Sequence, residues 1–273
     1  MNVTMPTSAV TGFEAIAIIP VYNHPSTVGA MVQGVLQAGL PCLLVDDGSD
    51  AHCARVLDGL VQHYAGQVAA VAGLPRVQLL RLKANEGKGG AMMAGLRHAL
   101  GQGFSHALQI DADGQHAVAD IAKFVQQARQ HPMAMICGVP IYDASVPKKR
   151  LYGRYATHVW VWINTLSLDI EDSMCGFRIY PLAPTVQVIN STTIGKRMEF
   201  DSEVLVRLHW RGVPFVTVRT HVTYPQDGLS HFRVLRDNVL ISGMHARLFL
   251  GMLARSPWLI ARKLRGGQQG ASA

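Results

Sequence analysis

The chain has 273 residues, of which 49% are hydrophobic and only 16% are charged, which excludes a disordered or highly charged tail protein. Its 25 Lys and Arg against 18 Asp and Glu give a net charge of +7, and this balance suits an anionic partner such as nucleotide phosphates or acidic lipid head groups. Nucleic acid is not expected as a partner, because no basic run with interleaved aromatics and no zinc-finger or helix-turn-helix spacing is present.

The cysteine spacing and the N-terminus indicate the compartment. The four cysteines are far apart and form no C-x-x-C pair, which favours reduced thiols in the cytosol over a zinc site or a disulfide framework. The N-terminal stretch "MNVTMPTSAVTGFEA" lacks a basic and then hydrophobic signal region. No run reaches the ~18 uninterrupted apolar residues of a membrane span. We therefore expect a cytoplasmic protein.

Strands and helices alternate along the first 140 residues. Apolar runs predict strands at 15–22, early in 41–50, at 76–83 and at 105–110, and helices lie between them within 23–39, 51–66 and 87–103. This alternation predicts an α/β fold with a doubly wound, mostly parallel sheet flanked by helices. The polar clusters "YNH", "DDGSD", "NEGKGG" and "DADGQH" follow at strand ends, where such sheets bind ligands. They predict one nucleotide-sized site.

The second half is less regular. Helices are expected near 150–168 and 198–212, a strand at 213–224, and a strand or turn at 173–181. From about 231 to 265 the chain is helical, basic and apolar. We expect one globular domain over residues 1–235, followed by a basic amphipathic C-terminal helix over 236–273.

The cluster "DADGQH" is the strongest candidate metal site. Asp111 and Asp113 share one side of an extended segment, and hard oxygen ligands at that spacing suit Mg²⁺ or Mn²⁺ bridging a diphosphate. The alternative is a turn in which Asp113 caps the next helix.

Two further clusters can contact a nucleotide. Asp46 or Asp47 in "VDDGSD" can accept hydrogen bonds from a base or ribose, although a simple turn is the alternative. The glycines and Lys88 of "NEGKGG" offer an anion site at a helix N-terminus. Neither the G-x-x-x-x-G-K-[ST] loop nor G-x-G-x-x-G is present, which disfavours P-loop ATPases and dinucleotide oxidoreductases.

The ordered set "IIPVYN", "VDDGSD", "NEGKGGAMMAG" and "DADGQH" resembles glycosyltransferase family 2. The similarity continues through "CGFRIYP", "MEFDSEVLVRL" and "YPQDGLSHFR", and so covers roughly residues 14–235. It points to the inverting enzymes with the GT-A fold, in the branch similar to dolichol-phosphate-mannose synthases. The C-terminal stretch also resembles family members of aryl-polyene or lipid-pigment pathways, whose acceptor would be a hydroxyl.

The resemblance implies a role for each matching residue. Asp47 would contact the base of a UDP- or GDP-linked sugar donor, in a pocket lined by Pro20, Tyr22 and Asn23, and Lys88 would lie near the diphosphate. Asp111 and Asp113 would hold the cation, with Ala112 between them at the donor site. Further ligands to the cation would be Gln115 and His231, although a surface role for His231 is as reasonable.

The acceptor side leaves alternatives open. A hydroxyl acceptor needs a carboxylate base, and Asp201 is favoured slightly over Glu199; in a helix, only one of the two is expected to face the site. A lipid-phosphate acceptor needs no base, and Arg178, with Arg150 and Arg154, could then bind its phosphate.

The basic C-terminal helix suits an anionic membrane surface, with Trp258 as an interfacial anchor; packing on the domain or at a homodimer interface is the alternative. The sequence thus predicts a metal-dependent inverting glycosyltransferase, peripheral on the inner face of the cytoplasmic membrane, with a lipid-linked or apolar acceptor. A nucleotidyltransferase and a non-catalytic sugar-nucleotide-binding protein are the rival hypotheses.

Overall fold

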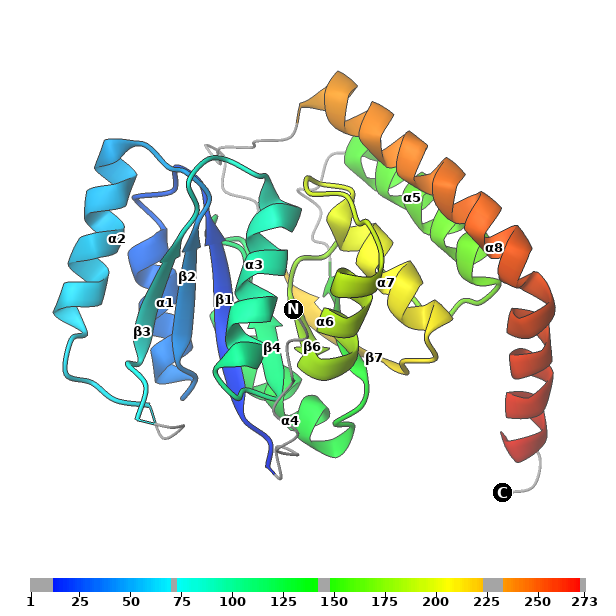
Figure 1. Ribbon diagram of the computed structural model, residues 1–273, viewed down its shortest axis with the longest axis horizontal. Helices are drawn as coiled ribbons and strands as arrows, with labels where there is room; N and C mark the ends of the chain where they lie inside the picture. Colours follow the sequence, from blue (N-terminus) through cyan, green and yellow to red (C-terminus); the bar gives the residue numbers. More distant parts are fainter. Residues whose placement is uncertain (1–11, 70–72, 142–147, 223–232, 271–273) are drawn as a thin grey trace, which may run out of the picture.

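The computed structural model describes residues 12–69, 73–141, 148–222 and 233–270, and its centre is a twisted sheet (Figure 1). The seven strands of this sheet stand in the order β3-β2-β1-β4-β6-β5-β7. Only β6 runs antiparallel to its neighbours, β4 and β5. The strands are β1 (Ala15–Val21), β2 (Cys42–Asp46), β3 (Val77–Arg81), β4 (His106–Gln109), β5 (Met135–Ile141), β6 (Arg178–Pro181) and β7 (Phe215–His221).

Helices cover both faces of the sheet. They are α1 (Val28–Gln37), α2 (Ala51–His63), α3 (Lys88–Gly101), α4 (Ile121–Gln130), α5 (Lys148–Thr165), α6 (Leu182–Ser191), α7 (Phe200–Trp210) and α8 (Val234–Gly270). A short 3₁₀ turn, Val118–Asp120, precedes α4.

Alternation of side chains along the strands builds two separate cores. In β1, Ile16 and Ile18 join the core beneath α3, α6 and α7, whereas Ala17 and Ile19 join the core beneath α1, α2 and α4. Successive strand residues point to opposite faces, so a strand buried on both faces must be apolar throughout, as the continuous run in β1 is.

The predicted fold class is confirmed, and most predicted elements lie within a few residues of their positions. Three elements were not predicted: α4, β5 and α6. The segment 173–181, left open between strand and turn, contributes β6. The antiparallel insertion of β6 between β4 and β5 is a non-local pairing, which no local pattern in the sequence reports.

The C-terminal helix α8 lies beside α5 and also contacts α7 (Figure 1). Met244, Leu248 and Met252 on its inner side are buried in the core, and its second half, which contains Pro257, runs in a different direction. Among the described helices, none is both long and apolar enough to cross a membrane. The division of the chain at residue 235 stays a prediction, although α8 begins at Val234, close to it.

Candidate active site

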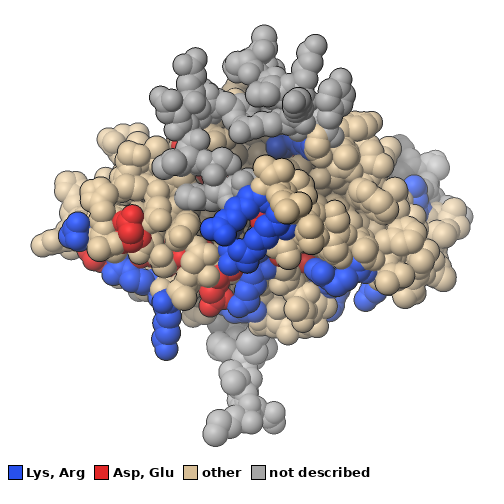
Figure 2. Space-filling view, turned by 90° about the horizontal axis from the view of Figure 1, so that it is seen from above, with Lys and Arg blue, Asp and Glu red and all other residues tan. Residues whose placement is uncertain are grey.

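The polar strand ends converge at one edge of the sheet, because β1, β2, β3 and β4 are parallel and their carboxyl ends meet there. Figure 2 shows the molecule from above, with a group of Lys and Arg side chains near the middle of the view and Asp and Glu side chains next to it. Positive side chains near this edge could attract an anionic ligand.

The two aspartates after β2 shape the loops around the site. Both oxygens of Asp47 accept backbone hydrogen bonds, from Glu86 N at 2.7 Å and from Gly87 N at 2.9 Å. Burial raises the pKa of Asp47, although these two bonds act in the opposite direction. Gly87 has φ +90°, a conformation that favours glycine. Asp47 therefore holds the glycine loop in place, and its contact with a base stays a prediction.

Asp46 is not available to a ligand, in contrast to the expectation. Its carboxylate accepts from Ser49 N at 2.9 Å and from Arg81 Nε at 2.8 Å, and the side chain is only 1% exposed. A carboxylate so enclosed stabilises the turn after β2 but cannot reach a nucleotide.

Pro20, Tyr22 and Asn23 lie at the end of β1, on the same edge as Asp47, and all three are half-buried. Asn23 has φ 55°, and its side chain accepts a hydrogen bond from Asp50 N at 2.8 Å. The three residues thus lie at the same sheet edge as Asp47, and their roles as a pocket wall and as donor contacts stay predictions.

Lys88, the first residue of α3, lies between two carboxylates. Its Nζ is 2.9 Å from Asp111 Oδ2 and 2.9 Å from Asp201 Oδ2, although these residues are far apart in sequence. Burial opposes the charge on Lys88, but the two carboxylates outweigh it and raise the pKa of Lys88 above its ordinary value. The ammonium is therefore permanently charged, and it joins the predicted metal residue to the predicted catalytic residue.

The close approach of α3 to α7 makes this arrangement possible. A Cβ on Gly89 would lie 2.4 Å from Phe200 Cβ, and one on Gly87 would lie 2.6 Å from the backbone oxygen of Lys196. Only glycine leaves room for the N-terminus of α7 at these two positions. The "GKGG" sequence therefore serves packing between helices, which brings Asp201 to Lys88.

Of the two candidate bases in "MEFDSE", Glu199 and Asp201, only one contacts Lys88. Asp201 contacts Lys88, whereas Glu199 turns toward the 195–197 backbone, where its Oε1 lies 3.5 Å from Arg197 N. The expectation that helical geometry separates the two residues is confirmed. Glu199 is not beside Asp111 or Lys88, so its predicted role as a base loses support.

A buried polar chain stands behind Asp201. Tyr180 Oη donates to Gln109 Oε1 at 2.6 Å, and Gln109 Nε2 donates to Asp201 Oδ1 at 3.2 Å. The negative carboxylate fixes the amide orientation, because the opposite orientation would face one oxygen with another. Sequence reasoning missed Gln109 and Tyr180; a polar residue at the end of β4, directly before Ile110 and Asp111, was the available signal for Gln109.

Arg178 lies in the same buried layer and cannot bind an acceptor phosphate, as had been expected of it. The side chain is completely buried, and it donates to Asp201 O at 2.6 Å and to Ser173 O at 2.9 Å. Its guanidinium therefore holds the first turn of α7 in place instead of contacting a ligand.

The predicted metal residues follow β4 and carry an incompletely satisfied carboxylate. Asp111 Oδ1 is buried without a hydrogen-bond partner, and Asp113 accepts a hydrogen bond from Gln115 N at 3.0 Å. Burial opposes ionisation of Asp111, but Lys88 and His116 lower its pKa; burial, and then the charge of Asp111, raise the pKa of Asp113. Excess negative charge and a free oxygen fit a divalent cation.

The described residues contain no group of three His, Cys, Asp or Glu side chains placed to hold a metal ion. Magnesium commonly takes only one or two carboxylates from the protein and completes its octahedron with phosphates and water. Asp111 and Asp113 fit that pattern. His231 lies outside the described residues, and ligation by Gln115 stays a prediction.

His116 and Ala112 complete the neighbourhood of the aspartates. His116 Nε2 is 3.8 Å from Asp111 Oδ2, and its ring lies against Phe177. Ala112 is buried, and its backbone oxygen accepts from Thr27 Oγ1, so it anchors the loop to the start of α1. A donor contact from Ala112 stays a prediction.

Arg154 also binds a carboxylate of the protein itself. It forms two 2.7 Å hydrogen bonds with Asp172, a bidentate pair of the strong kind. The pair joins α5 to the segment before β6, so the expected phosphate contact from Arg154 would require this pair to open. The side chain of Arg150 lies outside the described residues.

The fold is that of GT-A glycosyltransferases. A solved structure of glucosyl-3-phosphoglycerate synthase from Mycobacterium tuberculosis, in complex with Mn²⁺, UDP and glucosyl-3-phosphoglycerate, superposes with a TM-score of 0.62. The superposition covers 91% of this chain and 85% of that one, at 11% sequence identity. At this identity the likeness establishes the architecture.

The chain belongs to glycosyl transferase family 2, whose model matches residues 16–183. A dolichyl-phosphate beta-glucosyltransferase of Dictyostelium discoideum is 25% identical over 227 residues, which are 76% of this chain and 65% of that protein. A UDP-N-acetylglucosamine–dolichyl-phosphate N-acetylglucosaminyltransferase of Methanococcus voltae is 26% identical over 214 residues, covering 74% and 85%. The chain thus spans slightly under two thirds of the Dictyostelium relative.

Proposed function

We propose that this protein is an inverting glycosyltransferase that moves a sugar from a nucleoside diphosphate to a lipid phosphate. The observation that carries the proposal is Lys88, ion-paired to both Asp111 and Asp201 beside the unpartnered Asp111 Oδ1. These groups form a charged cluster at the sheet edge where α/β proteins bind nucleotides.

The donor is a UDP- or GDP-linked sugar, and the cofactor is Mg²⁺ or Mn²⁺. Asp111 and Asp113 would hold the cation, which neutralises the negative charge on the departing diphosphate. Lys88 adds a fixed positive charge at the same place, and because Asp201 holds it there, little reorganisation is needed during the reaction.

The acceptor is a lipid phosphate. A phosphate oxygen is already a nucleophile and needs no base, which matches the surroundings of Asp201. That carboxylate faces Lys88, Gln109 and, at 3.7 Å, Arg178, so its oxygens are engaged by donors. The acceptor named for both curated relatives, dolichyl phosphate, is of this class.

We further propose that the enzyme works at the cytoplasmic face of a membrane, where it would meet a lipid acceptor. Leu250, Leu253, Ile260 and Leu264 of α8 recur at helical spacing and are all at least half exposed; we call them the α8 apolar strip. Trp258 is also half exposed and can anchor at the interface. This surface would rest on the lipid that carries the acceptor.

Calorimetry of UDP and GDP, with Mn²⁺ or with a chelator, tests the donor site. We expect the chelator to weaken binding at least tenfold, and Asp111→Asn to show the weak affinity under both conditions. Asp58→Asn, at an exposed residue on α2, is the matched control and should behave as the wild type. Equal affinity with and without metal would contradict the metal assignment.

Transfer is tested by incubating the protein with a panel of sugar nucleotides and a short-chain polyprenyl phosphate. Release of nucleoside diphosphate together with a glycosylated lipid is the expected result. If sugar appears only on an alcohol without phosphate, the acceptor proposal is wrong; if pyrophosphate is released from a nucleoside triphosphate and a sugar phosphate, the protein is a nucleotidyltransferase.

A further inference from the structure

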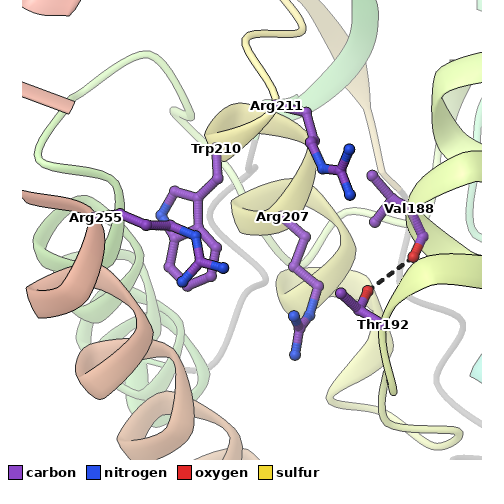
Figure 3. A pocket seen from close by; sticks show the side chains of 6 residues that line it. All are labelled: Val188, Thr192, Arg207, Trp210, Arg211 and Arg255. Atoms are coloured by element: carbon purple, nitrogen blue, oxygen red, sulfur yellow. Dashed lines mark hydrogen bonds between the residues drawn. The ribbon is translucent and has the colours of Figure 1, made fainter. Parts of the chain in front are cut away.

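A second basic site lies at the far end of α7, away from Asp201. A small pocket there is lined by side chains of α6, α7 and α8, with Thr192 just after α6 (Figure 3): Val188, Thr192, Arg207, Trp210, Arg211 and Arg255. Ten residues separate Asp201 from Arg211, which corresponds to roughly 15 Å along a helix. The pocket is thus separate from the donor site, although the two share one helix.

Three guanidinium groups surround this pocket, and only one of them is neutralised. Arg207 pairs with the buried Glu203 at 2.6 Å, through its Nη2. Among the described residues, no carboxylate lies within ion-pair distance of Arg211 or Arg255. Arg211 donates to Ser191 Oγ at 3.0 Å, and Arg255 donates to Gly251 O at 2.9 Å, both neutral acceptors. Two positive charges remain uncompensated.

Stabilisation of a helix end explains only part of this cluster. Arg207 and Arg211 belong to the last turn and the cap of α7, where positive charge is favourable. However, they are four residues apart, a spacing at which like charges repel each other. Arg255 comes from a different helix, α8, so the dipole of α7 does not account for its presence.

The remaining lining residues suit a phosphate group. Arg255 lies over the indole of Trp210, 4.7 Å from the ring centroid, which fixes one guanidinium at the edge of the pocket (Figure 3). Thr192 contributes a hydroxyl group, which donates to Val188 O at 2.8 Å in this structure. Guanidinium groups bind phosphate oxygens through paired hydrogen bonds, and two net positive charges match a phosphate dianion.

We propose that Arg207, Arg211 and Arg255 form a binding site for a phosphate group, distinct from the donor site. The phosphate is either free in solution or part of an anionic lipid head group. A lipid head group is considered because Arg255 lies on α8, between residues of the α8 apolar strip, which we propose to rest on lipid. This proposal stands independently of the proposed transferase function.

The test compares the double variant Arg211→Gln/Arg255→Gln with the wild-type full chain. Both side chains are exposed, so the substitutions should leave the fold intact. Arg207 is kept, because its loss would leave the buried Glu203 without its closest partner. Arg55→Gln/Arg236→Gln removes the same charge from exposed positions on α2 and at the start of α8, and it is the matched control.

Two probes separate the sources of phosphate. Inorganic phosphate is titrated by calorimetry in chelator, and flotation is measured with phosphatidylcholine vesicles with and without phosphatidic acid. A loss of phosphate affinity of at least tenfold in the pocket variant, but not in the control, supports the site. If the pocket variant loses only its binding to phosphatidic-acid vesicles, and the control variant does not, the site is supported with a lipid head group as its ligand. If both variants match the wild type or weaken equally with both probes, the proposal is overturned.

Discussion

At the scale of single residues, the site depends on three charged groups that lie far apart in sequence. Lys88 joins Asp111 to Asp201, and Gln109 supports Asp201 from behind. An ion pair enclosed in this way is costly to break from one side, because the remaining charge stays buried. Each of the three charged groups therefore fixes the position of the others. Replacing one of them by a neutral side chain of the same shape shows what its charge contributes.

Asp201→Asn tests whether this carboxylate orients Lys88 or acts as a base. The amide keeps the side-chain shape but loses the charge, so we expect the turnover rate to fall about tenfold to a hundredfold, with an unchanged pH profile. The measurement is kcat against pH with a lipid-phosphate acceptor. A loss of a thousandfold or more, together with disappearance of the acidic limb, would instead indicate general-base catalysis.

His245 gives the protein a pH-dependent stability. It lies on the inner side of α8, and burial lowers its pKa from 6.5 to about 4. The unfolded chain therefore binds a proton more readily than the folded chain, so the free energy of unfolding falls as pH drops from about 6.5 toward 4. We expect a loss of roughly 1–3 kcal/mol.

Urea unfolding of wild type and His245→Gln between pH 7 and pH 4.5 measures this effect. The glutamine keeps an acceptor for Asn164, whose Nδ2 lies 3.2 Å from His245 Nδ1. The stability difference between the two proteins should shrink or change sign at low pH. Parallel curves would show that His245 does not contribute to acid sensitivity.

At the scale of elements, the contact between α3 and α7 assembles the site. α3 carries Lys88 and α7 carries Asp201, and Gly89 lets their N-termini approach each other. Each helix also buries side chains in the core shared with α6. The geometry of the candidate site is thus set by helix packing, and a single methyl group at this contact should disturb it.

Gly89→Ala should destabilise the protein by about 1–3 kcal/mol, because the new Cβ would meet Phe200 and the backbone at Gly195. Gly59→Ala is the matched control: it lies within α2 with nothing near its added Cβ, so it should stabilise by up to about 1 kcal/mol. Urea denaturation compares the two variants. Equal stability of Gly89→Ala and wild type would show that the contact is loose.

At the scale of the whole molecule, we propose functions for two separate surfaces, the sheet edge with the candidate site and the outer surface of α8. α8 covers the domain with Met244, Leu248 and Met252 and leaves the α8 apolar strip exposed. A helix that buries one side in its own domain can still offer the other side to lipid. The net charge of +7 adds attraction to an anionic surface.

Leu253→Ser/Ile260→Ser should therefore weaken binding to anionic vesicles roughly tenfold, because apolar area no longer enters the interface. Val68→Ser/Met133→Ser is the control, since both residues are exposed and neither belongs to α8. Vesicle flotation at low and high salt is the measurement, and binding should weaken as salt rises. If the two double variants bind alike, the α8 apolar strip is not the docking surface.

The sequence alone determined the α/β class, the presence of the first four strands and the position of the polar clusters after them. These features are local: an apolar run, a glycine or an aspartate acts over a few residues. The family resemblance also came from local motifs in a fixed order, and the match over residues 16–183 confirms it.

Tertiary structure decided how those clusters are used. It enclosed Asp46 and Arg178 within the protein, separated Glu199 from Asp201, and placed Gln109 and Tyr180 behind the site. It also inserted β6 antiparallel between β4 and β5, and brought arginines of α7 and α8 around one pocket. The reason is that these are contacts between residues distant in sequence, set by packing of the two cores, whereas motifs and periodicity report only local preference.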